Sequence, residues 1–308
     1  MGIEPPLASE LERRLLVIAS KCCLEANRFD WYDSHFLRRF ESAKRFLRFA
    51  APDRVEEFEA AFGALRTRPD FQAQSVDPVF DPATFDEILE TVHSLPYVAL
   101  EHYESGSFGR SLLRNHPLFT RLQSTLTSMV SERVGEPVSP SYNFLSLYRG
   151  VGKCDPHLDD PLAKWTLDIC LEQNVEWPIF VSQVVDWPAT LPEAAPTIET
   201  LRADPAFRFD SIILSPNRGV IFSGSSQWHF REKISGSRSS FCHLLFLHYL
   251  PAGAESLADP KKWAAHFDIP ELDLLFAAEA LVMRKPDQTE ADDRTPESLP
   301  SRHTRGWD

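Results

Sequence analysis

Six short segments rich in β-forming residues follow one another between residues 141 and 252, and they constrain the fold more than any other feature of the chain. Gly, Pro, Asn and Asp punctuate them, and they read YNFLSLY, WTLDICLE, PIFVSQVV, SIILS, GVIFSG and FCHLLFLHYL. Segments of this length and number are typical of antiparallel β-structure. They favour a jelly roll, in which two sheets pack face to face.

Helical patterns surround this β region. Ser9 and Glu12 match a capping box, and apolar residues at helical spacing follow them. Pro52, Pro82 and Pro117 each stand where a helix could begin. The fold class that we expect is therefore α+β. Its parts would be a helical N-terminal region over 1–75, helices supporting the β core over 76–140, the catalytic β core over 141–252, C-terminal helices over 253–284 and a flexible tail over 285–308.

Composition narrows the range of partners. The net charge is −13 and no basic stripe is obvious, so we expect no nucleic-acid partner. The run FLRRFESAKRFLRF could be a basic patch, but its spacing favours the polar face of an amphipathic helix. No apolar run approaches the ~20 residues that span a bilayer, so we expect no membrane partner. Five scattered cysteines without a C-x-x-C pair favour a reducing, cytoplasmic location.

Three residues have the types and spacing of a metal site. His157 and Asp159 are separated by one residue, so an extended strand would point both to the same face. His229 would add a second imidazole from a distant strand. Two imidazoles and one carboxylate on one face of a metal leave three positions open, an arrangement found in non-haem Fe(II) oxygenases. The surrounding Asp and Pro residues also allow His157 to be a histidine in a surface turn.

A candidate carboxylate-binding pair follows the second histidine. Arg238 and Ser240 are again two residues apart, so both could reach one carboxylate from a single strand. The planar guanidinium of arginine binds a carboxylate through two parallel hydrogen bonds. The sequence ISGSRSS is also a good hairpin turn, and the hairpin could itself present the arginine.

Residues 142–251 resemble the Fe(II)/2-oxoglutarate-dependent dioxygenases, nearest in spacing to their prolyl-hydroxylase-like branch. The stretches SLYRGVGKCDPHLDD, GVIFSGSSQWHFRE and GSRSSFCHLLF carry the resemblance. It implies a double-stranded β-helix, a cupin-like jelly roll, with helices packed on one sheet. It also implies Fe(II) and 2-oxoglutarate as cofactor and cosubstrate. The positions matched are His157, Asp159 and His229 as iron ligands, Arg238 and Ser240 as the cosubstrate anchor, and Tyr148 as a strand-end tyrosine near the cosubstrate.

The resemblance implies the use of O2 to hydroxylate a C–H bond of a small molecule, amino acid or peptide, with release of succinate and CO2. Asp159 is retained, which argues against the related halogenases. The branch often has lysine at the anchor where this chain has Arg238, and the insert over 189–210 does not align. Two alternatives stay open: a cupin-like metalloenzyme that does not use 2-oxoglutarate, and an inactive β-helix module that binds a partner.

Three further residues are candidates for substrate binding. Arg231 lies two residues after His229 and would share its face, although it could instead be an exposed arginine paired with Glu232. Trp165 and Trp228 flank the metal motif and could form walls of a pocket, although core positions are the usual place for tryptophan.

Overall fold

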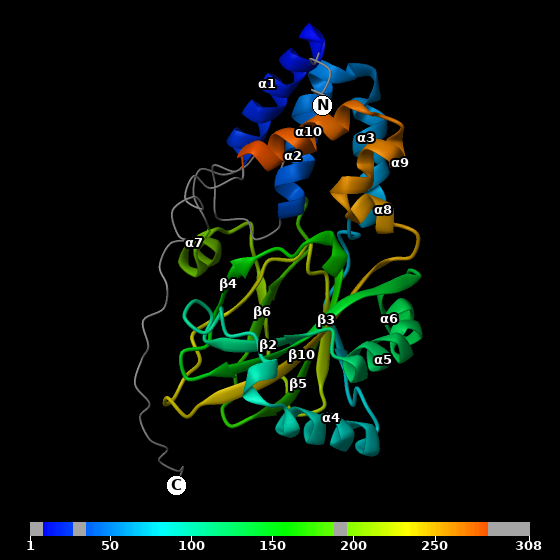
Figure 1. The fold of residues 1–308 in the computed structure, drawn as a ribbon. Coiled ribbons are helices and arrows are strands. Elements are labelled where there is room, and N and C mark those ends of the chain that lie inside the picture. The colour runs from blue at the N-terminus through cyan, green and yellow to red at the C-terminus, as the bar shows by residue number, and fades with distance from the viewer. Residues whose placement is uncertain (1–8, 27–34, 188–195, 283–308) are drawn as a thin grey trace, which may run out of the picture.

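The fold is built on two antiparallel sheets (Figure 1), seen in a computed structural model that describes residues 9–26, 35–187 and 196–282. The larger sheet has the strand order β1-β8-β5-β10-β3-β2 and the smaller one β4-β9-β6-β7. The strands are β1 (Gln74–Val76), β2 (Arg110–Arg114), β3 (Val138–Arg149), β4 (Cys154–His157), β5 (Trp165–Gln173), β6 (Ile179–Ser182), β7 (Phe209–Ile212), β8 (Gly219–Phe222), β9 (His229–Arg231) and β10 (Phe241–Pro251).

The chain winds back and forth between the two sheets. From β3 to β6, successive strands alternate between the larger and the smaller sheet, and the strands from β7 to β10 run back through the same two sheets. This winding is that of a double-stranded β-helix, so the expected α+β class and jelly-roll core are confirmed. Strands β1 and β2 extend the larger sheet at its two edges. The sequence patterns did not predict either strand, because each is short and lies among helices.

Helices from both ends of the described chain pack together at one end of the β core (Figure 1). Their shared core contains Phe36, Phe40, Phe62 and Trp263, with ring centroids 4.7–6.5 Å apart. The expected capping box at the start of the first helix is present, with Ser9 Oγ accepting from the Glu12 amide at 3.1 Å. These helices are α1 (Glu10–Ala26), α2 (His35–Ala50), α3 (Val55–Ala61), α8 (Glu255–Ala258), α9 (Trp263–Phe267) and α10 (Glu271–Val282).

A second group of helices covers the outer face of the larger sheet: α4 (Pro82–Ser94), α5 (Pro117–Thr125) and α6 (Thr127–Val134). Trp165 belongs to this outer core. Its ring lies 4.7 Å from that of Phe71, and its Nε1 donates to Glu136 at 2.6 Å. The expectation that Trp165 forms a pocket wall is therefore wrong. Side chains alternate between the two faces along β5. Because the Thr166 side chain points between the sheets, the Trp165 side chain points to the outer face of the larger sheet.

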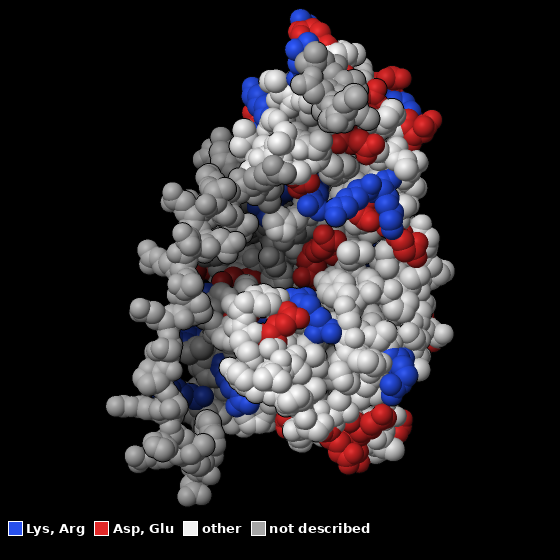
Figure 2. Space-filling view, viewed as in Figure 1, with Lys and Arg blue, Asp and Glu red and all other residues white. Residues whose placement is uncertain are grey.

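The remaining helix, α7 (Ile198–Ala203), lies within the expected insert over 189–210, of which residues 189–195 are outside the described residues. The tail expected over 285–308 also lies outside them. None of the described helices is both long and apolar enough to cross a membrane. On the face shown in Figure 2, acidic and basic side chains are interspersed.

Candidate metal centre

His157, Asp159 and His229 meet between the two sheets. One ligand atom of each lies within 4.8 Å of the other two. The Nε2 atom of His157 is 3.4 Å from Asp159 Oδ1, and that of His229 is 3.6 Å from Asp159 Oδ2. The pairing of β4 with β9 sets His157 directly opposite His229, which is how residues 72 positions apart in sequence come together. This is the three-residue group that the sequence predicted.

Both imidazoles are oriented by backbone carbonyls. The Nδ1 atom of His157 lies 2.8 Å from the carbonyl oxygen of Asp155, and Nδ1 of His229 lies 2.9 Å from that of Gln227. A carbonyl oxygen can only accept, so each ring carries its proton on Nδ1 when neutral. Each Nε2 lone pair then faces the Asp159 carboxylate. Backbone partners of this kind fix the tautomer and ring orientation of metal-binding histidines.

The protonation states suit a cation. Burial, reinforced by nearby His157, lowers the pKa of His229 to about 4. Burial would raise the pKa of Asp159, but the two imidazoles outweigh it and hold that pKa below its usual value. Burial also disfavours a charged His157, yet contact with Cys154 and Asp159 outweighs burial and raises its pKa. The triad therefore combines a carboxylate that favours its ionised form, a His229 that favours its neutral form and a His157 that favours its protonated form until a metal displaces the proton.

The Asp159 carboxylate is held by residues that follow the metal motif. The Oδ2 atom of Asp159 accepts a hydrogen bond from Thr166 Oγ1 at 3.3 Å. The backbone amide of Asp159 donates to the Gly224 carbonyl oxygen at 2.8 Å. A Cβ on Gly224 would lie only 2.3 Å from Asp159 Oδ2. Glycine at this position is therefore required by the close approach of the backbone to the carboxylate.

A cavity of about 1050 Å³ opens at the triad. Strands of both sheets line it, together with residues from α2 and α7. This volume lies just above the range of about 300–1,000 Å³ that holds drug-sized ligands. The cavity therefore has room for a small organic cosubstrate and a larger second ligand.

Arg231 lies deep in this cavity, and the interpretation of it as an exposed arginine paired with Glu232 is wrong. Its side chain is 3% exposed and forms an ion pair with Asp168, with Nη2 2.5 Å from Oδ2. Nη1 donates to the carbonyl of Trp177 at 2.5 Å. Tyr148 also lines the cavity, as expected, and its ring packs 4.7 Å from that of Trp177.

The structure does not bring Arg238 and Ser240 to the cavity, which corrects the expected anchor. Arg238 is exposed in the turn before β10, and neither residue is among the described residues that line the cavity. The turn is fixed by Ser240, whose Oγ accepts from the Ser237 amide at 2.9 Å and whose carbonyl accepts from the Gly150 amide at 2.8 Å. This segment therefore forms the turn that its sequence also allowed, and the Arg238 side chain is exposed to solvent.

Trp228 is likewise absent from the described lining of the cavity. It is 7% exposed and belongs to the apolar core shared with the terminal helices. The next residue, His229, points between the sheets, so alternation along β9 turns Trp228 to the other side. The expected role of Trp228 as a pocket wall is wrong for the same reason as that of Trp165.

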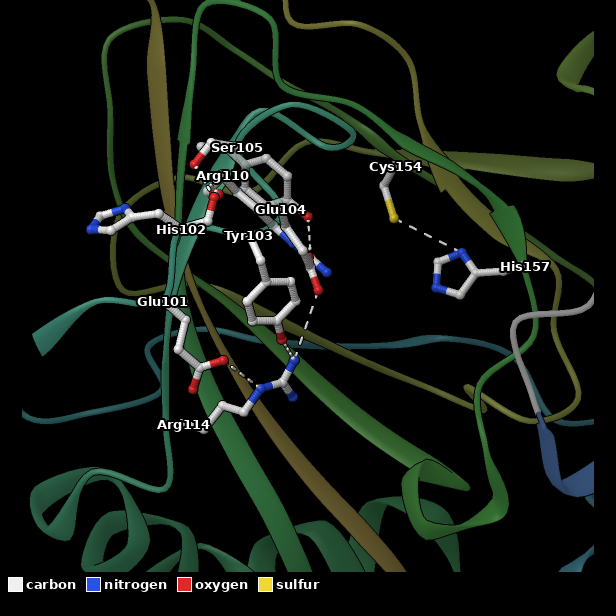
Figure 3. Close-up of polar contacts among 10 residues, drawn as sticks. Glu101, His102, Tyr103, Glu104, Ser105, Arg110, Arg114, Cys154 and His157 are labelled. Carbon is white, nitrogen blue, oxygen red and sulfur yellow. Dashed lines mark hydrogen bonds and ion pairs between the residues drawn. The ribbon is translucent and has the colours of Figure 1, made fainter. Parts of the chain in front are cut away.

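Several cavity residues had no signal in the sequence patterns. Figure 3 shows a charged group on β2 and the loop before it, across the cavity from Cys154 and His157. Arg110 and Arg114 in this group flank Glu104, at 2.5 Å and 3.8 Å respectively. His248 on β10 lines the cavity as well, and burial lowers its pKa to about 4. Alternation along β10 could have placed Phe246 and His248 on one face, but it could not have placed them in the same cavity as Arg110 and Arg114 of β2.

No family model matches the chain, and no curated protein sequence matches it. Solved structures give likenesses at low identity. The non-haem alpha-ketoglutarate-dependent epimerase SnoN from nogalamycin biosynthesis is 13% identical, with a TM-score of 0.43 and coverage of 68% of this chain and 88% of its own. HygX from Streptomyces hygroscopicus, solved with nickel and 2-oxoglutarate, is 9% identical, with a TM-score of 0.44 and coverage of 64% and 87%.

A 2OG-Fe(II) oxygenase-family oxidoreductase from Burkholderia pseudomallei is 13% identical, with a TM-score of 0.42 and coverage of 63% of this chain and 90% of its own. Likenesses at this level carry no argument about activity. The winding of the two sheets, the triad and the cavity of this chain itself are therefore the features that bear on its function.

Proposed function

We propose that the protein is a non-haem Fe(II)/2-oxoglutarate-dependent oxygenase that oxidises a C–H bond of an organic substrate. One observation carries the proposal: two Nε2 atoms and one carboxylate, each held by backbone or hydroxyl partners, converge at the wall of a large cavity. Two imidazoles, both neutral once a metal has displaced the proton from His157, and one carboxylate suit Fe(II), and they leave three coordination positions for other ligands.

His157, Asp159 and His229 would hold the iron. Bound together, iron and 2-oxoglutarate would supply the chemistry that uses O2 to oxidise a substrate C–H bond, with succinate and CO2 as the other products. The protein's contribution is orientation. The carbonyls of Asp155 and Gln227 keep both imidazoles in one tautomer, and Thr166 keeps the carboxylate turned toward them.

Arg231 supports the cosubstrate part of the proposal in place of Arg238. It follows His229 by two residues on β9, so both side chains point between the sheets. The contacts with Asp168 and the Trp177 carbonyl engage two of its five N–H donors and fix the guanidinium plane. We assign Arg231, with Tyr148 beside it, to the distal carboxylate of 2-oxoglutarate.

The test is an anaerobic titration of the Fe(II)-loaded protein with 2-oxoglutarate, followed by the visible charge-transfer band of the complex. Arg231→Gln would leave the Asp168 carboxylate buried and unpaired, so the variant to use is Arg231→Gln with Asp168→Asn. Loss of charge-assisted hydrogen bonds should weaken 2-oxoglutarate binding by about 10-fold or more. Arg238→Gln is the matched control and should bind 2-oxoglutarate normally. Weakening by Arg238→Gln alone would restore the sequence-based anchor.

One observation favours the alternative, a cupin-like metalloenzyme that does not use 2-oxoglutarate. Arg231 already has a carboxylate partner in Asp168, 2.5 Å away. If the Fe(II)-loaded protein gave no charge-transfer band at any 2-oxoglutarate concentration, this alternative would replace our proposal. The triad's ordered geometry argues against an inactive binding module.

The prolyl-hydroxylase-like branch, expected from the spacing of the motifs, is not supported, and we do not propose it: the residue at its anchor position, Arg238, lies outside the described cavity lining. We keep a cytoplasmic location, since Cys22, Cys23, Cys154, Cys170 and Cys242 are all free thiols, as expected in a reducing compartment.

A further inference from the structure

We infer that the substrate of this site carries an anionic group, a carboxylate or phosphate, beside a flat apolar ring system. Arg110 and Arg114 would bind the anion, and the aromatic side chains of β3 and β10 would contact the rings. The inference rests on the proposed function for the reaction, but the binding site is argued from cavity residues that hold no metal.

Arg110 is a largely buried cation with a fixed orientation. Its side chain is 13% exposed, and Nε lies 2.5 Å from a Glu104 oxygen. Nη1 donates to the Tyr148 hydroxyl at 2.6 Å. The guanidinium also lies 5.0 Å, 5.6 Å and 5.4 Å from the rings of Phe108, Phe144 and Tyr148. Such partners pre-organise an arginine for a planar anion, because little side-chain freedom is left to lose.

Arg114 lies beside Arg110 and is held in a similar way. Its guanidinium is 5.5 Å from the same Phe144 ring, and Nη2 donates to the Tyr103 hydroxyl at 2.8 Å. Its Nε is 3.3 Å from Glu101, a residue outside the described cavity lining. For each guanidinium, the contacts named engage fewer than its five N–H donors. Both arginines line the cavity.

The charge balance of this wall favours an anion over a cation. Two guanidinium groups and one carboxylate, Glu104, face the cavity here. Both oxygens of Glu104 are directed at arginines, with Oε2 2.5 Å from Arg110 and Oε1 3.8 Å from Arg114. An incoming ammonium group would have to compete for Glu104 against two fixed cations, whereas an incoming carboxylate or phosphate would meet two guanidinium groups that share one carboxylate within the cavity lining, since Glu101 pairs with Arg114 from outside it.

Partly buried rings continue from the arginines toward the metal centre. The rings of Phe144 and Phe246 stack across β3 and β10 at 4.8 Å, within 27° of parallel. Tyr142 and His248 stack at 4.2 Å, within 14°. All four line the cavity, and Tyr142, Phe144 and Phe246 remain only partly buried. Partly exposed apolar rings inside a cavity gain free energy when a ligand with an apolar surface covers them.

The position of this wall suits a substrate group at a distance from the reacting carbon. In Figure 3, Glu104 and Arg110 lie on one side of the cavity and His157 on the other. An anion held by Arg110 and Arg114 would leave the ring system lying over Phe144 and Phe246, with its far end toward the metal centre.

The test uses three probes in calorimetric titrations of the full chain: 2-naphthoate, 2-naphthylmethylamine and acetate. We expect 2-naphthoate to bind at least about 10-fold more tightly than 2-naphthylmethylamine, which lacks the anion, and than acetate, which lacks the rings. Arg114→Gln and Arg110→Gln should each weaken 2-naphthoate binding by about 10-fold. Glu104→Gln should strengthen it, because it removes the competing carboxylate.

Arg121→Gln is the matched control, because Arg121 pairs with Glu87 on the helical surface, outside the described lining. Arg114 is 39% exposed, so Arg114→Gln decides the question if Arg110→Gln does not fold. Tighter binding of the amine, or unchanged 2-naphthoate binding in Arg114→Gln, would overturn the inference. The inference would also be overturned if 2-naphthoate binding were lost only in the variant that combines Arg231→Gln with Asp168→Asn, since the anion would then occupy the assigned cosubstrate position.

Each titration is run on metal-free protein and again with Ni²⁺ and 2-oxoglutarate. Failure of Ni²⁺ or 2-oxoglutarate to bind would contradict the proposed function and leave the 2-naphthoate result standing. Normal Ni²⁺ and 2-oxoglutarate binding, with no selectivity for 2-naphthoate, would contradict only the substrate inference.

Discussion

Replacing Gly224 with alanine tests the metal centre without touching any ligand side chain. The new Cβ would lie 2.3 Å from Asp159 Oδ2, 2.5 Å from the Ala163 carbonyl oxygen and 2.9 Å from Thr166 Oγ1. Because Cβ contacts below 3.0 Å essentially do not occur, the carboxylate oxygen must retreat by about 0.7 Å, from 2.3 Å to 3.0 Å. Metal sites tolerate errors in ligand distance of only about 0.2 Å.

We therefore expect Gly224→Ala to weaken binding of Fe(II) or Ni²⁺ by about 10-fold to 100-fold, the usual cost of disturbing the residues that orient a ligand. The measurement is calorimetric titration of metal into metal-free protein, with thermal unfolding recorded in parallel. Gly63→Ala is the matched control, since nothing lies within 4 Å of its added Cβ. A Gly224→Ala protein that stays folded and binds metal as tightly as the Gly63→Ala protein would refute the reasoning.

Three other predictions concern charge. Contacts of His157 raise its pKa, so a metal must displace a proton from it and Ni²⁺ affinity should rise with pH. Titrations in buffers of different ionisation enthalpy should detect the release of about one proton for each Ni²⁺ bound. Folding lowers the pKa of His248 from 6.5 to about 4, so its contribution to stability is complete above pH 6.5 and is lost as pH falls toward 4. His248→Gln should therefore flatten the acid side of the stability curve, by about 3 kcal/mol in urea unfolding; an unchanged curve would contradict this. Arg231→Gln alone should destabilise the fold by about 3 kcal/mol, and adding Asp168→Asn should recover much of that loss, because the unpaired buried carboxylate is gone; additive losses would show that the two residues are not coupled.

The sequence was sufficient for features that depend on local chemistry. The one-residue spacing of His157 and Asp159 predicted that they would act together, and they do, although β4 ends at His157 and Asp159 lies just beyond it. The β-rich segments between 141 and 252 predicted the jelly roll. The capping box of Ser9 and Glu12 was also readable, because both partners lie within one helical turn. In each case the interacting groups are close in sequence or follow a fixed period.

Only the tertiary structure decided which cations face the cavity. Arg238 has the family spacing, but the backbone of its turn lies against Gly150 and the side chain is turned to solvent. Arg231 enters the interior because Asp168, on a strand 63 residues away in sequence, offers it a carboxylate. Arg110 and Arg114 reach the cavity because β2 joins the edge of the larger sheet beside β3. Local patterns fix which face of a strand a residue occupies, whereas the neighbour across that face is set by sheet pairing between segments far apart in the chain.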